Sequence, residues 1–278
     1  MPRSSLSSRL SPLAKSCCIR IRPWIAASLV WSVCPAAIAA DLLTEDFNSS
    51  GEGSRYTSST YAIGEDFFAR TDSNPDPRHN APGYTSLIFT APQSGGYWAS
   101  EDINSAGNPL GDHGIVRLNN LNVSGKNNLK VRIFLAHTDD RFDNTDSIQI
   151  QYAFDGNSGG TNLSAGSYST IGQFVGNGAD LFADANLKLD RNLNGVTFND
   201  LGDNPPAELS TTMTEYVFDI PVTGTQLSVQ VRINENGGTE EIAFDHIRIT
   251  GDLAATDPPA LAAIEGSAVM FTEGDSAS

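Results

Sequence analysis

The chain has 278 residues, and 33 Asp and Glu against 17 Lys and Arg give it a formal net charge of -16. Nucleic acid binding requires a basic face, so this composition excludes nucleic acid as a partner. An acidic balance of this size favours solubility and the binding of divalent cations.

The first 40 residues have the pattern of a secretory signal peptide. Residues 1–22 carry five basic side chains and no acidic one, and an apolar run extends from Trp24 to Val33. That run is shorter than the roughly 20 residues of a membrane span. Ala37 and Ala39 follow as a small-residue cleavage site. We therefore expect residues 1–40 to be removed, leaving a secreted, extracellular or cell-surface protein with no membrane span.

Loss of this leader changes the chemistry of the remaining chain. Cys17, Cys18 and Cys34 all lie in the leader, so the mature protein has no disulfide. The five basic residues leave as well, which moves the net charge from -16 to -21. If the domain needs a cross-link, something other than a disulfide must supply it.

Residues 41–252 are predicted to form one all-β domain. Apolar and polar side chains alternate in several segments, of which the clearest are 129–135, 148–154, 216–220 and 227–233. Such alternation is typical of strands with one buried and one polar face. About ten such segments, separated by Gly, Asn, Asp and Pro, predict a two-sheet antiparallel β-sandwich of jelly-roll type.

The C-terminal tail has a different composition. Residues 253–263 are rich in Ala and Pro and are predicted to be a linker. Residues 264–278 are interpreted either as the truncated start of a further β-repeat or as a disordered tail, because one strand cannot fold alone.

Asp245 lies in the last predicted strand, in the stretch "EEIAFDHIRIT". Counting alternate residues places it on the apolar face with Ala243, Ile247 and Ile249. A carboxylate on that face is unfavourable unless something pairs with it. A β-bulge where Asp245 accepts backbone N–H groups, or an exposed sheet edge, would also explain it.

A calcium ion is one candidate partner for Asp245. Glu45, Asp46 and Asn48 lie at the other end of the domain, and the terminal strands of a jelly roll often lie side by side. Calcium takes six to eight oxygen ligands in irregular geometry. We therefore predict a structural Ca2+ held by Glu45, Asp46, Asn48 and Asp245, which would also join the two ends of the domain.

A second acidic cluster lies in a predicted loop. Asp139, Asp140, Asp143 and Asp146 fall within "HTDDRFDNTD". These carboxylates form a second, weaker candidate for calcium, and a solvated turn is the alternative interpretation.

The stretch "SGGYWASEDIN" is a candidate ligand site. Tyr97 and Trp98 stand beside Glu101 and Asp102. Aromatic rings stack on sugar faces, and carboxylates accept hydrogen bonds from sugar hydroxyls. The alternative is that Trp98 belongs to the core of the sandwich.

Two stretches resemble known families. "TEDFNSSGEG" and "EEIAFDHIRITG" resemble the bracketing motifs of calcium-stabilised β-jelly-roll modules, among which the carbohydrate-binding modules of secreted bacterial enzymes are best known. The resemblance implies a structural calcium shared by an N-terminal acidic residue and Asp245. Those modules commonly have Glu where this chain has Asn48, so that role would pass to Glu45 or Asp46. The tail "AVMFTEGDSAS" resembles the opening of cadherin-like or immunoglobulin-like repeats of bacterial surface proteins.

The sequence shows none of the short motifs of nucleotide-binding enzymes, serine hydrolases or zinc proteases. We therefore predict a secreted, non-catalytic binding or adhesion module that is stabilised by calcium, with an extracellular glycan or a cell-surface component as its partner. Two alternatives stay open: a polysaccharide hydrolase that uses Glu101 and Asp102 as acid and base, and a structural spacer domain of a large surface protein.

Overall fold

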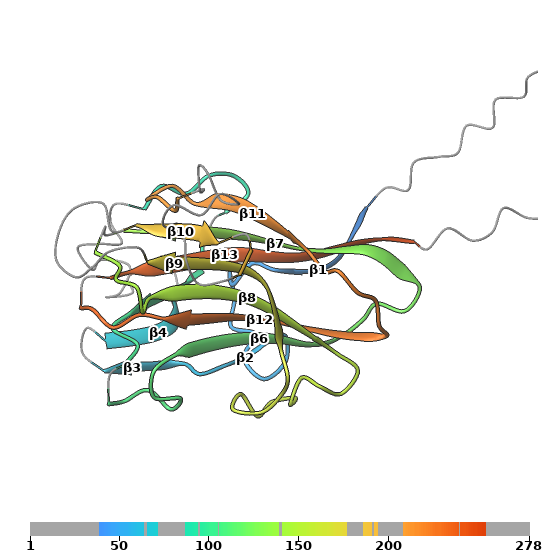
Figure 1. The fold of residues 1–278 in the computed structure, drawn as a ribbon, viewed down its shortest axis with the longest axis horizontal. Coiled ribbons are helices and arrows are strands. Elements are labelled where there is room, and N and C mark those ends of the chain that lie inside the picture. The colour runs from blue at the N-terminus through green and yellow to red at the C-terminus, as the bar shows by residue number, and fades with distance from the viewer. Residues whose placement is uncertain are drawn as a thin grey trace, which may run out of the picture. The chain divides into compact units, whose positions relative to one another are not determined.

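The computed structural model describes residues 39–63, 66–71, 87–93, 95–104, 106–138, 141–176, 186–190, 192–193, 208–238 and 240–253. These residues form two β-sheets and contain no α-helix (Figure 1). Accordingly, the described part of the chain has no helix that could cross a membrane. The predicted leader up to residue 38 and the predicted linker and tail from residue 254 lie outside the described residues.

The first sheet is antiparallel and has seven strands. They are β1 (Ala40–Glu45), β3 (Tyr61–Ile63), β4 (Asp66–Thr71), β5 (Tyr97–Glu101), β7 (Lys126–His137), β11 (Thr214–Asp219) and β13 (Ile242–Leu253). The order is β11-β7-β13-β5-β4-β3, and β1 pairs with β13 outside that row. The last strand reaches Leu253, one residue into the predicted linker, because its end pairs with the start of β7.

The second sheet has six strands. They are β2 (Thr57–Ser58), β6 (Gly114–Asn122), β8 (Ser147–Phe154), β9 (Ser169–Gly176), β10 (Leu187–Asp190) and β12 (Gln226–Asn234). The order is β10-β9-β8-β12-β6-β2, and these strands lie one below another in Figure 1. The chain crosses repeatedly between the sheets, since β5, β7, β11 and β13 belong to one and β6, β8 and β12 to the other.

The predicted antiparallel sandwich of jelly-roll type is therefore confirmed. The described residues form thirteen strands, whereas alternation predicted about ten. The shortest strands, β2, β3 and β10, have two, three and four residues. Segments of that length are too short to show a periodic pattern, so sequence reading misses them.

Alternate side chains from both sheets form the main core. The predicted alternating segments supply much of it, with fully buried side chains at Val131, Ile133, Leu135, Ile148, Ile150, Val231 and Ile233. Each such side chain contributes about 1.5–3 kcal/mol by leaving water. This burial holds the two sheets face to face.

A second, smaller apolar cluster covers the outer face of the seven-stranded sheet. Phe67, Tyr97, Phe134 and Ala243 belong to it, each next in the chain to a residue of the main core. The central strands at this end of the sheet are consequently buried on both faces. This explains why every residue of β5 is buried.

β13 is paired differently along its two edges. One edge pairs with β7 over most of its length. The other edge pairs with β5 from Ile242 to Phe244 and with β1 from Ile247 to Gly251. Between these partners lies a β-bulge, because the register with β7 shifts between Asp245 and Arg248.

Because of the bulge, the prediction that Asp245 shares a face with Ile247 and Ile249 is wrong. Phe244 and Ile247 both belong to the main core, although they are three residues apart. The extra residue changes the phase of alternation, so Asp245 lies with Ala243 on the outer face, while Ile247 and Ile249 face the core. The bulge that was considered as an alternative is present.

Trp98 provides a test of this packing. It is 1% exposed and its ring centroid lies 5.2–6.1 Å from those of Phe47, Tyr56, Phe68 and Phe244. We expect Trp98→Ala to lower the free energy of unfolding by about 3–5 kcal/mol, as measured by urea denaturation.

Val217→Ala is the control, because the side chain of Val217 lies on an edge strand and is 44% exposed. Its effect should stay within about 0.5 kcal/mol. Equal effects of the two substitutions would show that Trp98 is not part of the core.

Candidate functional site

The two ends of the domain lie side by side. β1 pairs antiparallel with β13, and Glu45 is the register partner of Ile247. The carboxylates of Glu45 and Asp46 are close enough to Asp245 to repel its charge. The pairing of the terminal strands therefore brings the acidic residues from both ends together.

Glu45 already has a positively charged partner. The Nε of Arg55 donates to Oε2 of Glu45 at 2.7 Å, and Nη2 donates to Oε1 at 3.1 Å. The backbone N–H of Phe47 donates to Oε1 at 3.0 Å. The hydrogen bonds of this buried carboxylate are thus satisfied within the chain. The hydrogen bond between Arg55 and Glu45 is also the main cause of the raised pKa of Arg55.

Asp46 and Asn48 form a short turn around Phe47. The backbone N–H and side-chain amide of Asn48 donate to the two oxygens of Asp46 at 3.1 and 3.0 Å. The side-chain oxygen of Asn48 accepts the N–H of Gly96 at 3.0 Å, which ties this turn to the start of β5. Phe47 has a left-handed φ of 50° and its ring is fully buried. The turn therefore positions the ring of Phe47 in the core.

Asp245 is 1% exposed at the bulge. Its Oδ1 accepts the backbone N–H of His246 at 2.6 Å. Burial raises the pKa of Asp245 to about 8; the hydrogen bond from His246 opposes this rise, and repulsion by Asp46 and Glu45 adds to it. The ionised form of Asp245 is therefore unfavourable in the chain by itself.

Calcium fits this junction in part. A cation would relieve the repulsion between Asp245 and Asp46. Both oxygens of Glu45 and the side-chain oxygen of Asn48, however, already accept hydrogen bonds. Among the described residues, no three His, Cys, Asp or Glu side chains are spaced to hold one ion together. For all four predicted ligands to bind calcium, Arg55 would have to release Glu45.

The predicted aromatic ligand site is not formed. Tyr97 and Trp98 are buried on opposite faces of β5, Tyr97 in the outer cluster and Trp98 in the main core. Neither ring can stack on a sugar from these positions. Strand alternation alone allowed Trp98 to be either exposed or part of the core. It is buried because β5 is packed on both faces.

Glu101 and Asp102 are not arranged as an acid and a base. Glu101 is buried at the end of β5, and Asp102 follows it with a left-handed φ of 48°. Burial, together with repulsion by Asp66, raises the pKa of Asp102. Hydrolysis of a glycosidic bond needs two carboxyl groups that flank an open cleft. A buried Glu and its chain neighbour do not provide that arrangement.

The second acidic cluster divides into two parts. Asp139 and Asp140 lie outside the described residues. Asp143 caps a turn, since its Oδ1 accepts the N–H and the hydroxyl of Thr145 at 2.6 Å each. Asp146 is instead fully buried. The interpretation as a solvated turn thus suits Asp143 and fails for Asp146.

Arg117 organises the outer face of the six-stranded sheet, and no sequence motif had pointed to this arginine. This buried arginine of β6 donates from Nε and Nη2 to Oε1 of Gln230 at 3.0 and 2.8 Å. It also donates to four loop carbonyls, those of Gly160, Asn162, Leu163 and Ala165, at 3.0–3.3 Å. The guanidinium of Arg117 therefore holds the loop between β8 and β9 against the sheet.

A row of glutamines continues from Arg117 across the sheet. Gln230 donates to Gln151 at 2.6 Å, Gln151 to Gln149 at 3.0 Å, and Gln149 to Gln173 at 3.2 Å. The row crosses β12, β8 and β9, and every amide donates in the same direction along it. Alternation in the sequence showed a polar face here, but the cross-strand partners depend on the register.

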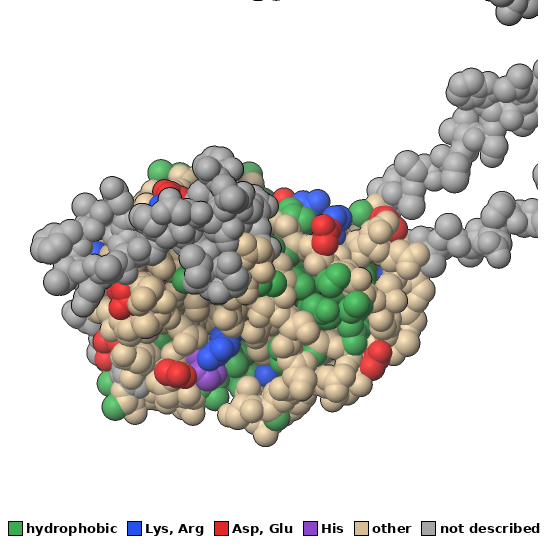
Figure 2. Space-filling model, viewed as in Figure 1, with side chains coloured by type: hydrophobic (Ala, Val, Ile, Leu, Met, Phe, Trp, Pro, Cys, Tyr) green, Lys and Arg blue, Asp and Glu red, His purple; other side chains and the backbone are tan. Residues whose placement is uncertain are grey.

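A hollow of about 370 Å3 opens over one end of this row. Its lining includes Arg117, Gln151, Gln230, Arg232, Tyr168 and His113. The Tyr168 ring centroid lies 4.8 Å from the guanidinium carbon of Arg117. Figure 2 views this face, and a histidine lies there beside basic and acidic side chains over β2 and β6. The hollow thus gathers two arginines, an aromatic ring and ordered amides in an otherwise acidic chain.

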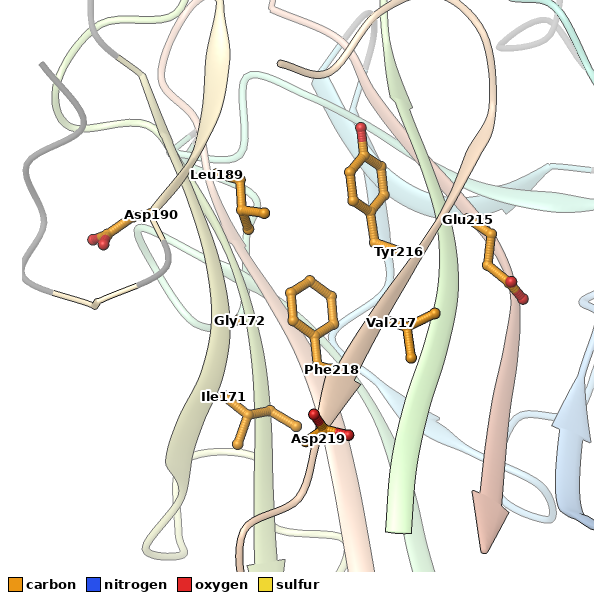
Figure 3. Close-up of a pocket in the computed structure, with 9 residues that line it drawn as sticks. All are labelled: Ile171, Gly172, Leu189, Asp190, Glu215, Tyr216, Val217, Phe218 and Asp219. Atoms are coloured by element: carbon orange, nitrogen blue, oxygen red, sulfur yellow. The ribbon is translucent and has the colours of Figure 1, made fainter. Parts of the chain in front are cut away.

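A second hollow, of about 400 Å3, lies between edge strands of the two sheets. In Figure 3, Tyr216 and Phe218 of β11 point into it, facing Leu189 of β10 and Ile171 of β9. Two of its three carboxylates form ion pairs, Glu215 with Arg132 and Arg248, and Asp219 with Lys130. The third, Asp190, accepts the N–H of Leu193 at 2.7 Å. This hollow at the edge of the sandwich is therefore lined by both apolar and acidic side chains.

Comparison with known proteins gives neighbours in structure alone. No protein-family model matches the chain, and no curated protein matches it. Among solved structures, the K2 cleaved adhesin domain of Lys-gingipain is 18% identical, with a TM-score of 0.42, over 74% of this chain and 96% of that one. TmCBM61 in complex with β-1,4-galactotriose is 10% identical, with a TM-score of 0.39, over 76% and 97%. The CBM22-1 xylan-binding domain of Xyn10C from Paenibacillus barcinonensis is 12% identical, with a TM-score of 0.35, over 79% and 99%.

The raised pKa of Asp245 predicts how stability depends on pH. A carboxyl group whose pKa rises from 3.8 to about 8 on folding holds its proton more tightly in the folded state. The metal-free domain should therefore lose stability as the pH rises through this window. Asp245→Asn removes this contribution and keeps an oxygen for His246. In chelator, we expect Asp245→Asn to be more stable than the parent at about pH 8 and to have a weaker pH dependence.

Urea denaturation in chelator at acidic, neutral and alkaline pH measures this effect. Asp219→Asn is the control, because Asp219 is exposed on β11. An Asp245→Asn variant that is less stable than the parent at high pH would contradict the assignment of an unfavourable buried charge.

Arg117→Lys tests the anchoring of the loop. Lysine keeps the charge but has a single ammonium in place of the planar fork, so it cannot reach Gln230 and four carbonyls together. Leaving several buried acceptors unsatisfied should cost at least about 2 kcal/mol of stability. Residues 155–168 should become more sensitive to limited proteolysis and exchange their amide hydrogens faster. Arg232→Lys, in the same hollow, should leave that loop protected; equal exchange in both variants would contradict the role of Arg117.

Proposed function

We propose that this chain is a secreted, non-catalytic binding module that holds an extracellular glycan on the outer face of the six-stranded sheet. The observation that carries the proposal is the row of hydrogen-bonded glutamines beside the Arg117 hollow. A spacer domain needs no such row on its surface. The interpretation as a hydrolase loses its acid and base, because Glu101 is buried and Asp102 is its chain neighbour.

The chemistry of this face suits sugar hydroxyls. Each hydroxyl both donates and accepts a hydrogen bond, and a glutamine amide offers both functions in one plane. Gln149 uses one of its two amide hydrogens in the row, and it is only half-buried. Because Arg117, Gln230 and Gln151 hold the row in place, little side-chain freedom would be lost on binding. Tyr168 adds an aromatic ring, which favours sugars over other polar ligands.

Calcium at the junction of β1 and β13 remains part of this proposal. It is supported by the burial of Asp245 beside Asp46, and Arg55 is its competitor for Glu45. Its role there would be to join the two ends of the domain, without contact to the glycan.

Binding to soluble polysaccharides tests the proposed function. The purified chain is titrated calorimetrically with three neutral polysaccharides, xylan, galactan and a mixed-linkage glucan. Polygalacturonate is included as an acidic polysaccharide. We expect one of them to bind, and Gln149→Ala with Gln173→Ala to weaken its binding at least about tenfold, since that corresponds to the loss of one or two hydrogen bonds.

Asn127→Ala is the matched control, because it removes an exposed amide from β7 in the other sheet. It should bind as the parent does. No binding to any of these polysaccharides, or binding that the glutamine substitutions leave unchanged, would overturn the proposal in favour of the spacer.

A further inference from the structure

A third hollow lies at the rim of the six-stranded sheet. β12 and β8 are antiparallel, and their last register pair at this end is Asn234 with Ser147. The next residues outward are therefore Glu235, which follows β12, and Asp146, which precedes β8. Both line a hollow of about 260 Å3, together with Asn104, Thr145, Asn234, Asn236 and the exposed Asp112, whose carboxylate is paired with His113.

The two carboxylates are buried without sufficient partners. Asp146 is 0% exposed; its Oδ2 accepts the N–H of Asp143 at 2.6 Å, and no described residue donates to its Oδ1. Glu235 is 1% exposed, and neither of its oxygens has a donor with hydrogen-bond geometry among the described residues. The hydroxyl of Ser100 donates to the carbonyl of Ile242 at 3.4 Å, and it also lies close enough to Glu235 to oppose the rise in the pKa of Glu235 that burial causes. Three buried carboxylate oxygens at one hollow thus lack a well-formed hydrogen bond from the described residues, which a folded protein normally avoids.

The surroundings add negative charge to this pair. Glu240 is buried close by, with Oε2 accepting the N–H groups of Gly237 at 2.7 Å and Asn236 at 3.2 Å. Its charge repels both Asp146 and Glu235. The residues that line the hollow include no Lys or Arg. A positive charge from outside the chain would therefore relieve the pair.

We propose that this hollow is a binding site for a calcium ion, with Asp146 and Glu235 as its charged ligands. The remaining residues that line the hollow are Asn, Thr and the exposed Asp112, so every side chain there offers oxygen and none is a Cys. Oxygen donors of this kind select a hard cation, and calcium accepts carboxylate, amide and water oxygens in irregular geometry. Two carboxylates balance the charge of one divalent ion, and neutral oxygens and water complete its coordination.

The ion would link two loops that the fold leaves at this rim. Residues 141–146 lead into β8, and residues 235–238 follow β12. Asn236 already bridges them, because its side-chain amide donates to the hydroxyl of Thr145 at 2.8 Å. The site is independent of the glycan face and uses none of the four residues predicted at the junction of β1 and β13.

Calcium-dependent thermal unfolding tests the site. The purified chain is stripped with chelator and its midpoint is followed as calcium is added up to about 10 mM, the range of weak extracellular sites. The parent midpoint should rise by roughly 5–10 °C at about 100 times the dissociation constant. Isothermal titration calorimetry then gives the number of ions bound.

Glu235→Gln and Asp146→Asn are the decisive variants, because they keep the shape and remove the charge. In chelator, Glu235→Gln should melt above the parent, since a buried uncompensated charge has gone. With calcium, the order should reverse, because the variant gains nothing from the ion. Asp219→Asn, which removes an exposed carboxylate, should respond to calcium as the parent does.

Asp245→Asn separates this site from the predicted junction site. If Asp245→Asn keeps the calcium response and Glu235→Gln loses it, the ion binds at the rim. A parent midpoint that calcium leaves unchanged, or a response that Glu235→Gln and Asp146→Asn retain, would overturn the proposal. If calcium leaves the parent midpoint unchanged, we infer that Asp146 and Glu235 share a proton and bind no cation.

Discussion

The pairing of β13 is the constraint on which the rest of the structure depends. This strand is bound to β7 along one edge and divides its other edge between β5 and β1. The bulge between Asp245 and Arg248 separates the two partners and restores the inward direction of Ile247. Without the extra residue, the following half of the strand would turn its apolar side chains away from the core. The same arrangement joins the first and last strands of the domain and lets Phe47 reach Phe244 and Trp98.

An acidic domain with few cations must satisfy its buried charges individually. Glu45 is satisfied by Arg55, and Arg117 by the oxygen of Gln230 and four backbone carbonyls. Asp146 and Glu235 have no such partner in the part of the chain that the structure describes. Their position follows from the fold, since residues that flank adjacent antiparallel strands meet at the rim. A divalent cation is the partner whose charge and ligand preference match this gap.

The two larger hollows differ in what their walls can do. The gap between β11 and β9 is lined by apolar side chains and by three carboxylates, of which two are held in ion pairs, and it has no amide side chain. The hollow beside Arg117 is lined by apolar side chains, two arginines, a tyrosine and two glutamines, and hydrogen bonds hold Arg117, Gln230 and Gln151 in place. Ordered polar groups on a rigid sheet recognise a polar ligand at a low cost in side-chain freedom. This contrast is why the glycan is proposed on the six-stranded sheet and not at the edge of the sandwich.

The sequence by itself determined the long strands and the two-layer architecture, because alternation of apolar and polar residues is a local property of the chain. It also indicated that the acidic ends would meet, through the jelly-roll pattern. Only the tertiary structure decided the rest. The bulge reversed the face of Asp245, and packing on both faces of β5 buried Trp98. The contact of Asp146 with the same hollow as Glu235 depends on the register of β8 and β12, and so does the row of glutamines. Period and composition can predict which residues are polar, but the register between strands determines which polar groups meet.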